Sequence, residues 1–294
     1  MFLLIVSNAL CSYHIYGMAT GYPVHVIEPF IASSRIAGYT GELRLGVLAS
    51  QWKSVAHLGS RFNVTFVAVD PDHTTTIALQ RMKIYMSWCN ALPRDAWVLT
   101  VDVRDSFMQR DLFSIEYMRQ IDAPINLFYE AATIKLGEEP TNSGWIRSCW
   151  GERSVPFVTG KQVICSGSIF GRVTELLELL ADYEMLAATV PHCRDIHGID
   201  QGILNYLAHL RHWDTSASVK IWPQGAGPVN TIGWDASIIN WRDGLVHDAN
   251  GRVSAFVHQY DRHGHISATY NNFVRQRAKQ HDTLTRHFNR IYRN

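Results

Sequence analysis

Residues Trp97-Val98-Leu99-Thr100-Val101-Asp102-Val103-Arg104-Asp105 form the most informative segment of this sequence. An apolar run of strand length, broken only by Thr100, leads directly into two carboxylates three residues apart. In an open α/β sheet, ligands bind beyond the carboxyl ends of the strands, where these acids fall. Two hard oxygen ligands suit Mg²⁺ or Mn²⁺ holding a diphosphate. The alternative interpretation is that Asp105 caps a helix beginning near Ser106.

Strand-length apolar runs alternate with helix-period segments on both sides of this stretch. Strands are expected at Phe2–Val6, Leu43–Leu48, Val64–Val69, Trp97–Val101, Ile125–Tyr129, Val163–Cys165 and Val253–Val257. Helix faces are expected at Ala78, Met82, Tyr85, Met86 and Cys89, at Val173, Leu176, Leu177 and Leu180, and at Ile203, Leu204, Leu207 and Leu210. This alternation predicts a single Rossmann-like α/β/α sandwich with a mostly parallel central sheet.

The composition excludes several classes of protein. The chain has 294 residues, and 47% of them are hydrophobic, which is more than a disordered chain contains. Its 27 Lys+Arg residues barely exceed its 26 Asp+Glu residues, so it lacks the basic excess of a protein that binds nucleic-acid polymers. No apolar run approaches the roughly 20 residues that span a bilayer. Phe2–Val6 is too short for a signal-peptide core, and no basic residue precedes it. The five cysteines are scattered without a C-x-x-C pair, so we expect reduced thiols and a cytoplasmic or otherwise soluble intracellular protein.

Three further segments place polar groups just beyond predicted strands or at the start of a helix. His258, after the last predicted strand, is either a nitrogen ligand for a metal or a structural histidine. Ser166 and Gly167 form a turn between a predicted strand and a helix, where a ligand can approach the backbone; an ordinary connection is the alternative. Asp200-Gln201 opens a helix, so Asp200 is a helix cap, a sugar ligand or a catalytic base.

Taken in order, these segments resemble the nucleotide-sugar-dependent glycosyltransferases of the GT-A fold. The Asp102-Val103-Arg104-Asp105 segment is similar to the D-x-x-D motif in the glycosyltransferase domain of collagen lysyl hydroxylases. The resemblance implies that Asp102, Asp105 and His258 bind Mn²⁺, which bridges the diphosphate of UDP. Cys165-Ser166-Gly167 and Asp200-Gln201 resemble the family's N-S-G and D-D-Q elements. Cys165 replaces an asparagine and Ile199 replaces an acid, and both departures concern the sugar contacts.

The resemblance covers roughly residues 1–265. The strings Gln109-Arg110-Asp111-Leu112-Phe113 and His258-Gln259-Tyr260-Asp261-Arg262-His263 look like those of uncharacterised GT-A proteins of plants, algae and large algal viruses. The resemblance implies a nucleotide-binding half (1–105), an acceptor and sugar half (106–265), and a separate basic tail (266–294). Residues 275–294 carry six Lys or Arg against one acid, which predicts a polar helix on the outside. Contact with an anionic membrane or a lipid-linked acceptor is the alternative.

The implied function is transfer of a sugar from a UDP-sugar (UDP-glucose, UDP-galactose or UDP-xylose) to a hydroxyl of a glycan or glycoconjugate, with Mn²⁺ or Mg²⁺ as cofactor. Asp200 is the candidate catalytic residue. The candidate donor contacts are Ser7, Asn8, Asp70, Arg81, Asp102, Ser166, Gly167 and Gln201, and the candidate acceptor contacts are Trp145, Trp222 and Trp234. Arg81 is equally compatible with a solvated helix position, and tryptophans more often pack in cores. Neither the stereochemistry nor the oligomeric state follows from the sequence.

Three other functions remain open at this point. A nucleotidyltransferase or a nucleotide-sugar hydrolase could use the same metal and diphosphate, although a nucleotidyltransferase usually has a glycine-rich basic loop after the first strand. A non-catalytic carbohydrate-binding protein would need no metal cluster.

Overall fold

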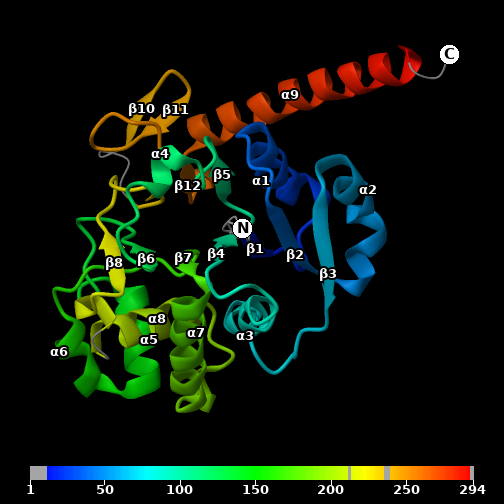
Figure 1. The fold of residues 1–294 in the computed structure, drawn as a ribbon. Coiled ribbons are helices and arrows are strands. Elements are labelled where there is room, and N and C mark those ends of the chain that lie inside the picture. Colours follow the sequence, from blue (N-terminus) through cyan, green and yellow to red (C-terminus); the bar gives the residue numbers. More distant parts are fainter. Residues whose placement is uncertain (1–11, 211–212, 235–238, 292–294) are drawn as a thin grey trace, which may run out of the picture.

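A seven-stranded sheet forms the centre of the molecule (Figure 1). The computed structural model describes residues 12–210, 213–234 and 239–291, and the strand order is β3-β2-β1-β4-β7-β6-β8. Neighbours are parallel, except that β7 is antiparallel to both β4 and β6. The strands are β1 Tyr13–Met18, β2 Glu42–Leu48, β3 Val64–Val69, β4 Trp97–Asp102, β6 Ile125–Phe128, β7 Ser168–Arg172 and β8 Val219–Trp222. The predicted α/β fold around a mostly parallel sheet is confirmed; the predicted strand at Phe2–Val6 lies outside the described residues.

Helices cover both faces of this sheet, which gives three layers (Figure 1). Successive strand side chains point to opposite faces. Ile15 of β1 therefore shares a core with α1 and α2, whereas its neighbour Tyr16 shares another core with α3, α7 and α8. The helices are α1 Val24–Ile36, α2 Trp52–Phe62, α3 Ile77–Cys89, α4 Ile115–Met118, α5 Pro140–Trp150, α6 Val155–Val158, α7 Val173–Ala188, α8 Ile199–Leu210 and α9 Gly264–Ile291.

The strand order creates a switch point between β1 and β4. From β1 the chain builds β2 and β3 on one side, and then returns to place β4 on the other side. Such a reversal leaves a crevice at the carboxyl ends of the two central strands, where ligands bind in α/β sheets. Met18 and Asp102, the last residues of β1 and β4, are register partners. The acidic motif therefore begins at the switch point.

A second, three-stranded sheet lies directly beyond that point. It has the order β5-β12-β9, with β5 Ser106–Met108, β9 Val229–Thr231 and β12 Phe256–His258. The alternative that Asp105 caps a helix near Ser106 is therefore wrong, because this segment forms β5, the antiparallel partner of β12. A small hairpin of β10 (Asn240–Arg242) and β11 (Leu245–His247) lies nearby.

Two predicted strand positions are wrong in detail. Val163–Cys165 contains no named strand, and only Ile164 makes an isolated bridge, to Tyr129. The Ser166-Gly167 turn leads into β7 instead of a helix, because β7 fills the space between β4 and β6 and pairs with the backbone groups of both. The last predicted strand is shifted: β12 covers Phe256–His258, and Val253 makes only an isolated bridge.

The C-terminal helix begins before the basic stretch 275–294, on which the predicted polar helix was based. α9 starts at Gly264, and its first turns bury Ile266, Tyr270 and Val274 in a core that also contains Phe107 of β5. The rings of Phe107 and Tyr270 stack with centroids 3.8 Å apart. The rest of α9 extends away from the body of the molecule (Figure 1).

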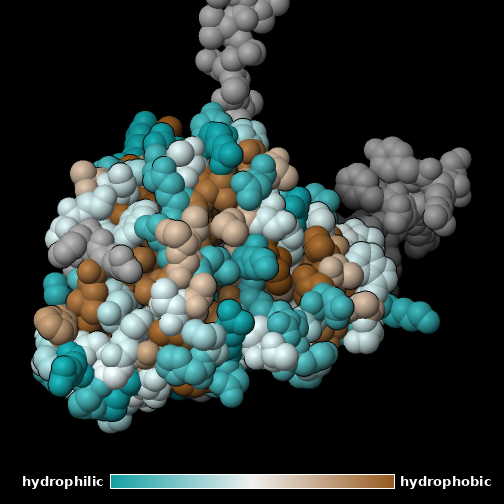
Figure 2. All heavy atoms as spheres, turned by 90° about the horizontal axis from the view of Figure 1, so that it is seen from below, coloured by the Kyte–Doolittle hydropathy of each residue, from teal (hydrophilic) through white to brown (hydrophobic). Residues whose placement is uncertain are grey.

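No helix of the described residues combines the length and apolar character needed for a membrane span. The face seen in Figure 2 carries hydrophobic residues in separate groups between hydrophilic ones. The exposed large side chains Trp52, Phe157 and Met185 lie on three different helices, α2, α6 and α7.

The expectation of reduced thiols is wrong for one pair of cysteines. Cys149 at the end of α5 forms a disulfide with Cys193, which precedes α8. Disulfides persist chiefly in oxidising compartments, so this pair does not support the expected cytosolic location. Among the described cysteines, Cys89 and Cys165 are free and buried.

Replacing both Cys149 and Cys193 with serine should lower the free energy of unfolding by about 2–4 kcal/mol, because the crosslink restricts the unfolded chain. Urea unfolding followed by tryptophan fluorescence measures this change. Wild-type protein kept in a reducing agent should match the variant. An unfolding midpoint that neither treatment moves would contradict the prediction.

Candidate metal centre and ligand cavity

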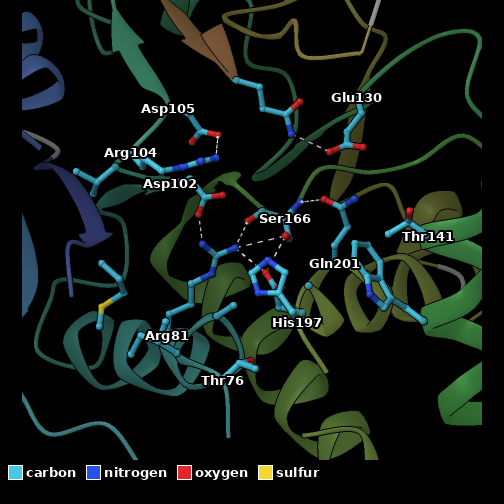
Figure 3. A pocket seen from close by; sticks show the side chains of 18 of the residues that line it. Thr76, Arg81, Asp102, Arg104, Asp105, Glu130, Thr141, Ser166, His197 and Gln201 are labelled. Atoms are coloured by element: carbon cyan, nitrogen blue, oxygen red, sulfur yellow. Dashed lines mark hydrogen bonds and ion pairs between the residues drawn. The ribbon is translucent and has the colours of Figure 1, made fainter. Parts of the chain in front are cut away.

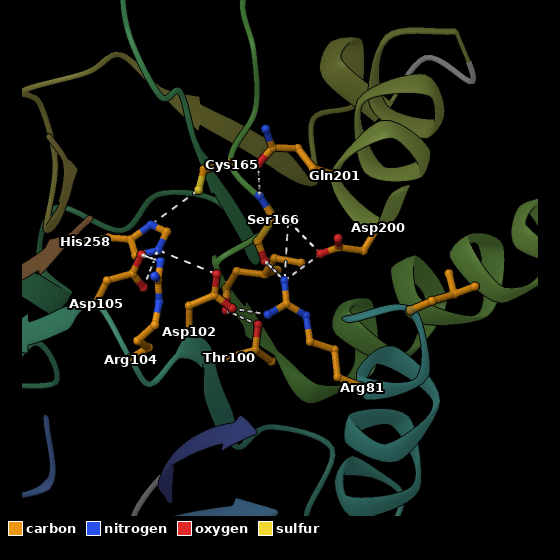
Figure 4. Close-up of polar contacts among 12 residues, drawn as sticks. Arg81, Thr100, Asp102, Arg104, Asp105, Cys165, Ser166, Asp200, Gln201 and His258 are labelled. Carbon is orange, nitrogen blue, oxygen red and sulfur yellow. Dashed lines mark hydrogen bonds and ion pairs between the residues drawn. The ribbon is translucent and has the colours of Figure 1, made fainter. Parts of the chain in front are cut away.

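Two carboxylates and one imidazole meet where the two sheets join. Asp102 ends β4, Asp105 follows one turn later, and His258 ends β12 (Figure 4). The register of β5 and β12 pairs His258 with Ser106, and the backbone N–H of Gln259 donates to the carbonyl of Asp105 at 2.7 Å. Nε2 of His258 lies 3.7 Å from Oδ2 of Asp102 and 3.4 Å from Oδ1 of Asp105. The three candidate ligand atoms lie within 4.8 Å of one another, so the residues predicted from sequence form a possible metal site.

The site contains polar atoms with no hydrogen-bond partner. Nε2 of His258 and Oδ1 of Asp105 are buried and make no hydrogen bond, although buried polar atoms nearly always do. A Cβ added to Gly167 would lie 2.3 Å from Cε1 of His258 and 2.7 Å from Oδ2 of Asp102. Oxygen and imidazole donors around such a space fit a divalent cation.

The electrostatics of the three residues favour a positive charge among them. Burial opposes ionisation of Asp102, but Arg81 and His258 outweigh it and hold the pKa of this carboxyl well below its usual value. Asp105 behaves in the same way, with His258 lowering its pKa against burial. Burial alone would lower the pKa of His258, but the neighbouring Cys165, Asp105 and Asp102 raise it well above its usual value. Both carboxylates are thus ionised at neutral pH, which suits cation ligands.

Arg81 connects the metal residues to Asp200. This buried α3 side chain forms an ion pair with Oδ1 of Asp102 and another with Oδ2 of Asp200 at 2.7 Å (Figure 4). Ser166 completes the network, since its hydroxyl donates to Oδ2 of Asp200 at 2.8 Å and its N–H donates to Oε1 of Gln201 at 3.3 Å. The alternative that Arg81 is a solvated helix residue is therefore wrong.

These groups line a cavity of about 490 Å³. Its wall combines the ends of β1 and β4 with the first residues of α3, α5 and α8 (Figure 3). Four carboxylates line it, those of Asp102, Asp105, Glu130 and Asp200, against three guanidinium groups, those of Arg81, Arg104 and Arg262. A divalent cation would reverse the net charge of this set from negative to positive, which suits an anionic ligand.

The other predicted contacts divide into three groups. Trp145, Trp234, Ser166 and Gln201 line the cavity. Trp222 does not, because it is buried in the core with its indole N–H donating to Asn126 at 2.9 Å. Asp70 is exposed after β3 and is also absent from the lining. Ser7 and Asn8 lie outside the described residues.

Glu130 is the main site residue that the sequence analysis missed. Its buried carboxylate accepts hydrogen bonds from Nε2 of Gln259 and Nε1 of Trp234, both at 3.0 Å. Burial raises the pKa of this carboxyl above its usual value, and the hydrogen bond from Gln259 offsets the increase only in part. The signal was its position two residues after the β6 run, at the carboxyl end of a strand.

The sequence matches no protein-family model and no curated protein. The fold and the site define this chain as a mixed α/β protein with a possible divalent-cation centre beside a cavity that charged side chains line.

Replacing Gly167 with alanine should weaken Mn²⁺ binding by at least about tenfold, because the new methyl group would enter the space between Asp102 and His258. Gly144→Ala in α5 is the matched control, since a Cβ there meets nothing within 4 Å. Isothermal titration calorimetry of both variants checks the prediction. Equal Mn²⁺ affinity in the two variants would contradict it.

Proposed function

We propose that this chain is a metal-dependent glycosyltransferase of the GT-A type, which moves a sugar from a UDP-sugar to a hydroxyl of a glycan or glycoconjugate. The observation that carries the proposal is the cluster of Asp102, Asp105 and His258 at the switch point of the sheet, with the two aspartates lining a charged cavity. The order of the acidic motif, the Ser-Gly turn, the Asp-Gln pair and the late histidine supports the same assignment.

The site has the chemistry that a nucleotide diphosphate requires. Asp102, Asp105 and His258 would hold Mn²⁺, or Mg²⁺, and a cation so placed stabilises the charge that develops on the departing diphosphate. Arg262 lines the cavity and has no ion pair among the described residues, so its guanidinium is free to attract a phosphate. The residues after β1, Thr20 and Tyr22, line the same cavity. In a parallel sheet with this switch point, that is where a nucleotide binds.

Each oxygen of the Asp102 carboxylate has a different neighbour. Oδ1 pairs with Arg81, whereas Oδ2 faces His258. Arg81 in turn holds Asp200, so this guanidinium sets the position of Asp200 relative to the metal ligands. We propose that Arg81, by holding both aspartates, aligns the donor sugar between the diphosphate and Asp200.

Two carboxylates are available to act on the acceptor hydroxyl. Asp200 forms an ion pair with Arg81 and accepts a hydrogen bond from the Ser166 hydroxyl. Glu130 is buried, and its hydrogen-bond donors are the neutral groups of Gln259 and Trp234. Trp145 and Trp234 offer aromatic surface in the cavity for a sugar acceptor.

Nucleotide release from UDP-glucose, UDP-galactose, UDP-xylose, UDP-N-acetylglucosamine and GDP-sugars, with and without Mn²⁺, tests the proposal. We expect a UDP-sugar to be turned over only with the metal, and Asp102→Asn to lower the rate on the order of a hundredfold. Asp70→Asn, an exposed aspartate outside the cavity, is the matched control. Full metal-independent turnover in both the wild type and Asp102→Asn would contradict the proposal. Analysis of the products separates a glycoside from free sugar or pyrophosphate.

Neutral variants of the two carboxylates identify the one that activates the acceptor. The Glu130→Gln variant can keep the contact with Gln259. Oε1 of Gln259 has no hydrogen-bond partner, so the Gln259 amide can flip and present this oxygen to the new NH₂ group at position 130. Loss of a general base costs about 10²- to 10⁴-fold in rate. We expect Asp200→Asn to show such a loss in glycoside formation, with UDP affinity nearly unchanged. If Asp200→Asn forms glycoside at the wild-type rate and Glu130→Gln does not, Glu130 is the residue that activates the acceptor hydroxyl.

A further inference from the structure

The imidazole of His258 has a hydrogen-bonding contact on the side away from the carboxylates. Nδ1 of the ring lies 3.3 Å from Sγ of Cys165, and both side chains are only 1% exposed. The opposite ring nitrogen, Nε2, faces Asp102 and Asp105. Among the described residues, Cys165 is the only hydrogen-bonding partner of this ring.

This arrangement matters because a neutral imidazole carries one proton. Nε2 can offer a lone pair to a cation only when that proton is on Nδ1, and a proton on Nδ1 needs an acceptor. Groups that hold the second nitrogen of a metal-binding histidine fix both its tautomer and its ring orientation. Sγ of Cys165 is the acceptor that the structure provides.

The position of Cys165 is itself fixed by the backbone. Its N–H donates to the carbonyl of Phe128, at the end of β6, at 2.9 Å. The next two residues also serve the site, since Ser166 binds Asp200 and Gly167 leaves the space beside His258 and Asp102. The Cys165-Ser166-Gly167 turn therefore places three consecutive residues against the site.

We infer that Cys165 is a positioning residue of the metal centre: its sulfur accepts the Nδ1 proton of His258 and so directs the lone pair of Nε2 toward Asp102 and Asp105. This inference rests on the metal site of the proposed function. It assigns a role to the cysteine that departs from the asparagine expected at this position. The sulfur would not be a cation ligand itself, because it contacts Nδ1, the ring nitrogen turned away from Asp102 and Asp105.

The test is Mn²⁺ affinity of the full chain, measured by calorimetry without any sugar donor. Cys165→Ala removes the acceptor and should weaken Mn²⁺ binding by about 10- to 100-fold. Cys165→Ser retains a hydroxyl that can accept the same proton, and should recover most of the affinity. Cys89→Ala is the control, since Cys89 is also a free buried thiol but lies at the end of α3 in the hydrophobic core.

A second readout follows the proton directly. The ¹⁵N resonances of the ring nitrogens of His258, recorded with the same concentration of diamagnetic Mg²⁺ for every variant, report which nitrogen carries the proton and which one binds the cation. We expect a protonated Nδ1 and a metal-bound Nε2 in the wild type and in Cys165→Ser, and a smaller fraction of this form in Cys165→Ala. If Cys165→Ala does not fold, Cys165→Val fills the volume without an acceptor and should show the same loss.

Each outcome has one meaning. Wild-type affinity and tautomer in the folded alanine or valine variant would overturn the inference while leaving the metal site intact. An equal loss in Cys89→Ala would also overturn it, because the effect would then be general loosening of the core. Absence of Mn²⁺ binding by the wild type would instead overturn the proposed function.

Discussion

The pairing of β5 with β12 is the constraint on which the site depends. Asp105 and His258 are far apart in the sequence, and closing so long a loop costs conformational entropy. The ladder compensates for that cost with backbone hydrogen bonds and aligns His258 with the residue that follows Asp105. The bond from the Gln259 N–H to the Asp105 carbonyl extends this alignment by one residue. Without this pairing, the carboxylates at the end of β4 would have no nitrogen donor beside them.

Bringing these groups together has an electrostatic cost that the rest of the site offsets in part. Two carboxylates in one buried place repel each other and lose hydration. Arg81 balances Asp102 from one side and also holds Asp200, while Arg104 pairs with Asp105 at 2.8 Å. The unpaired atoms of Asp105 and His258 remain between these pairs. These polar atoms thus lack hydrogen bonds at the point where a bound cation would contact them. Such a local departure from the usual pairing of polar groups is typical of a functional site.

The second half of the chain builds the cavity wall around this centre. β7 enters the sheet between β4 and β6, and the turn before it brings Cys165, Ser166 and Gly167 against His258, Asp200 and the space beside Asp102. The Cys149–Cys193 disulfide ties α5 to the segment before α8, and both helices contribute residues to the cavity. The cavity is therefore held by a covalent bond outside its lining and by hydrogen bonds to the site residues themselves.

The sequence by itself determined the class of fold and pointed to Asp102 and Asp105, because both depend on local patterns, whereas His258 joined them as a candidate ligand through the resemblance to a family. Apolar periodicity locates strands and helices, and acids directly after a strand lie at the ligand-binding edge of a sheet. Only the tertiary structure decided what depends on pairing between distant segments: that Ser106 begins a strand, that Ser168–Arg172 runs antiparallel between β4 and β6, and that Arg81 is buried between two aspartates. The contacts of Glu130 and Cys165 and the Cys149–Cys193 disulfide also depend on pairing between distant segments. Their partners lie between 44 and 129 residues away in the chain, which is farther than any local pattern extends, and no propensity encodes which distant groups will meet.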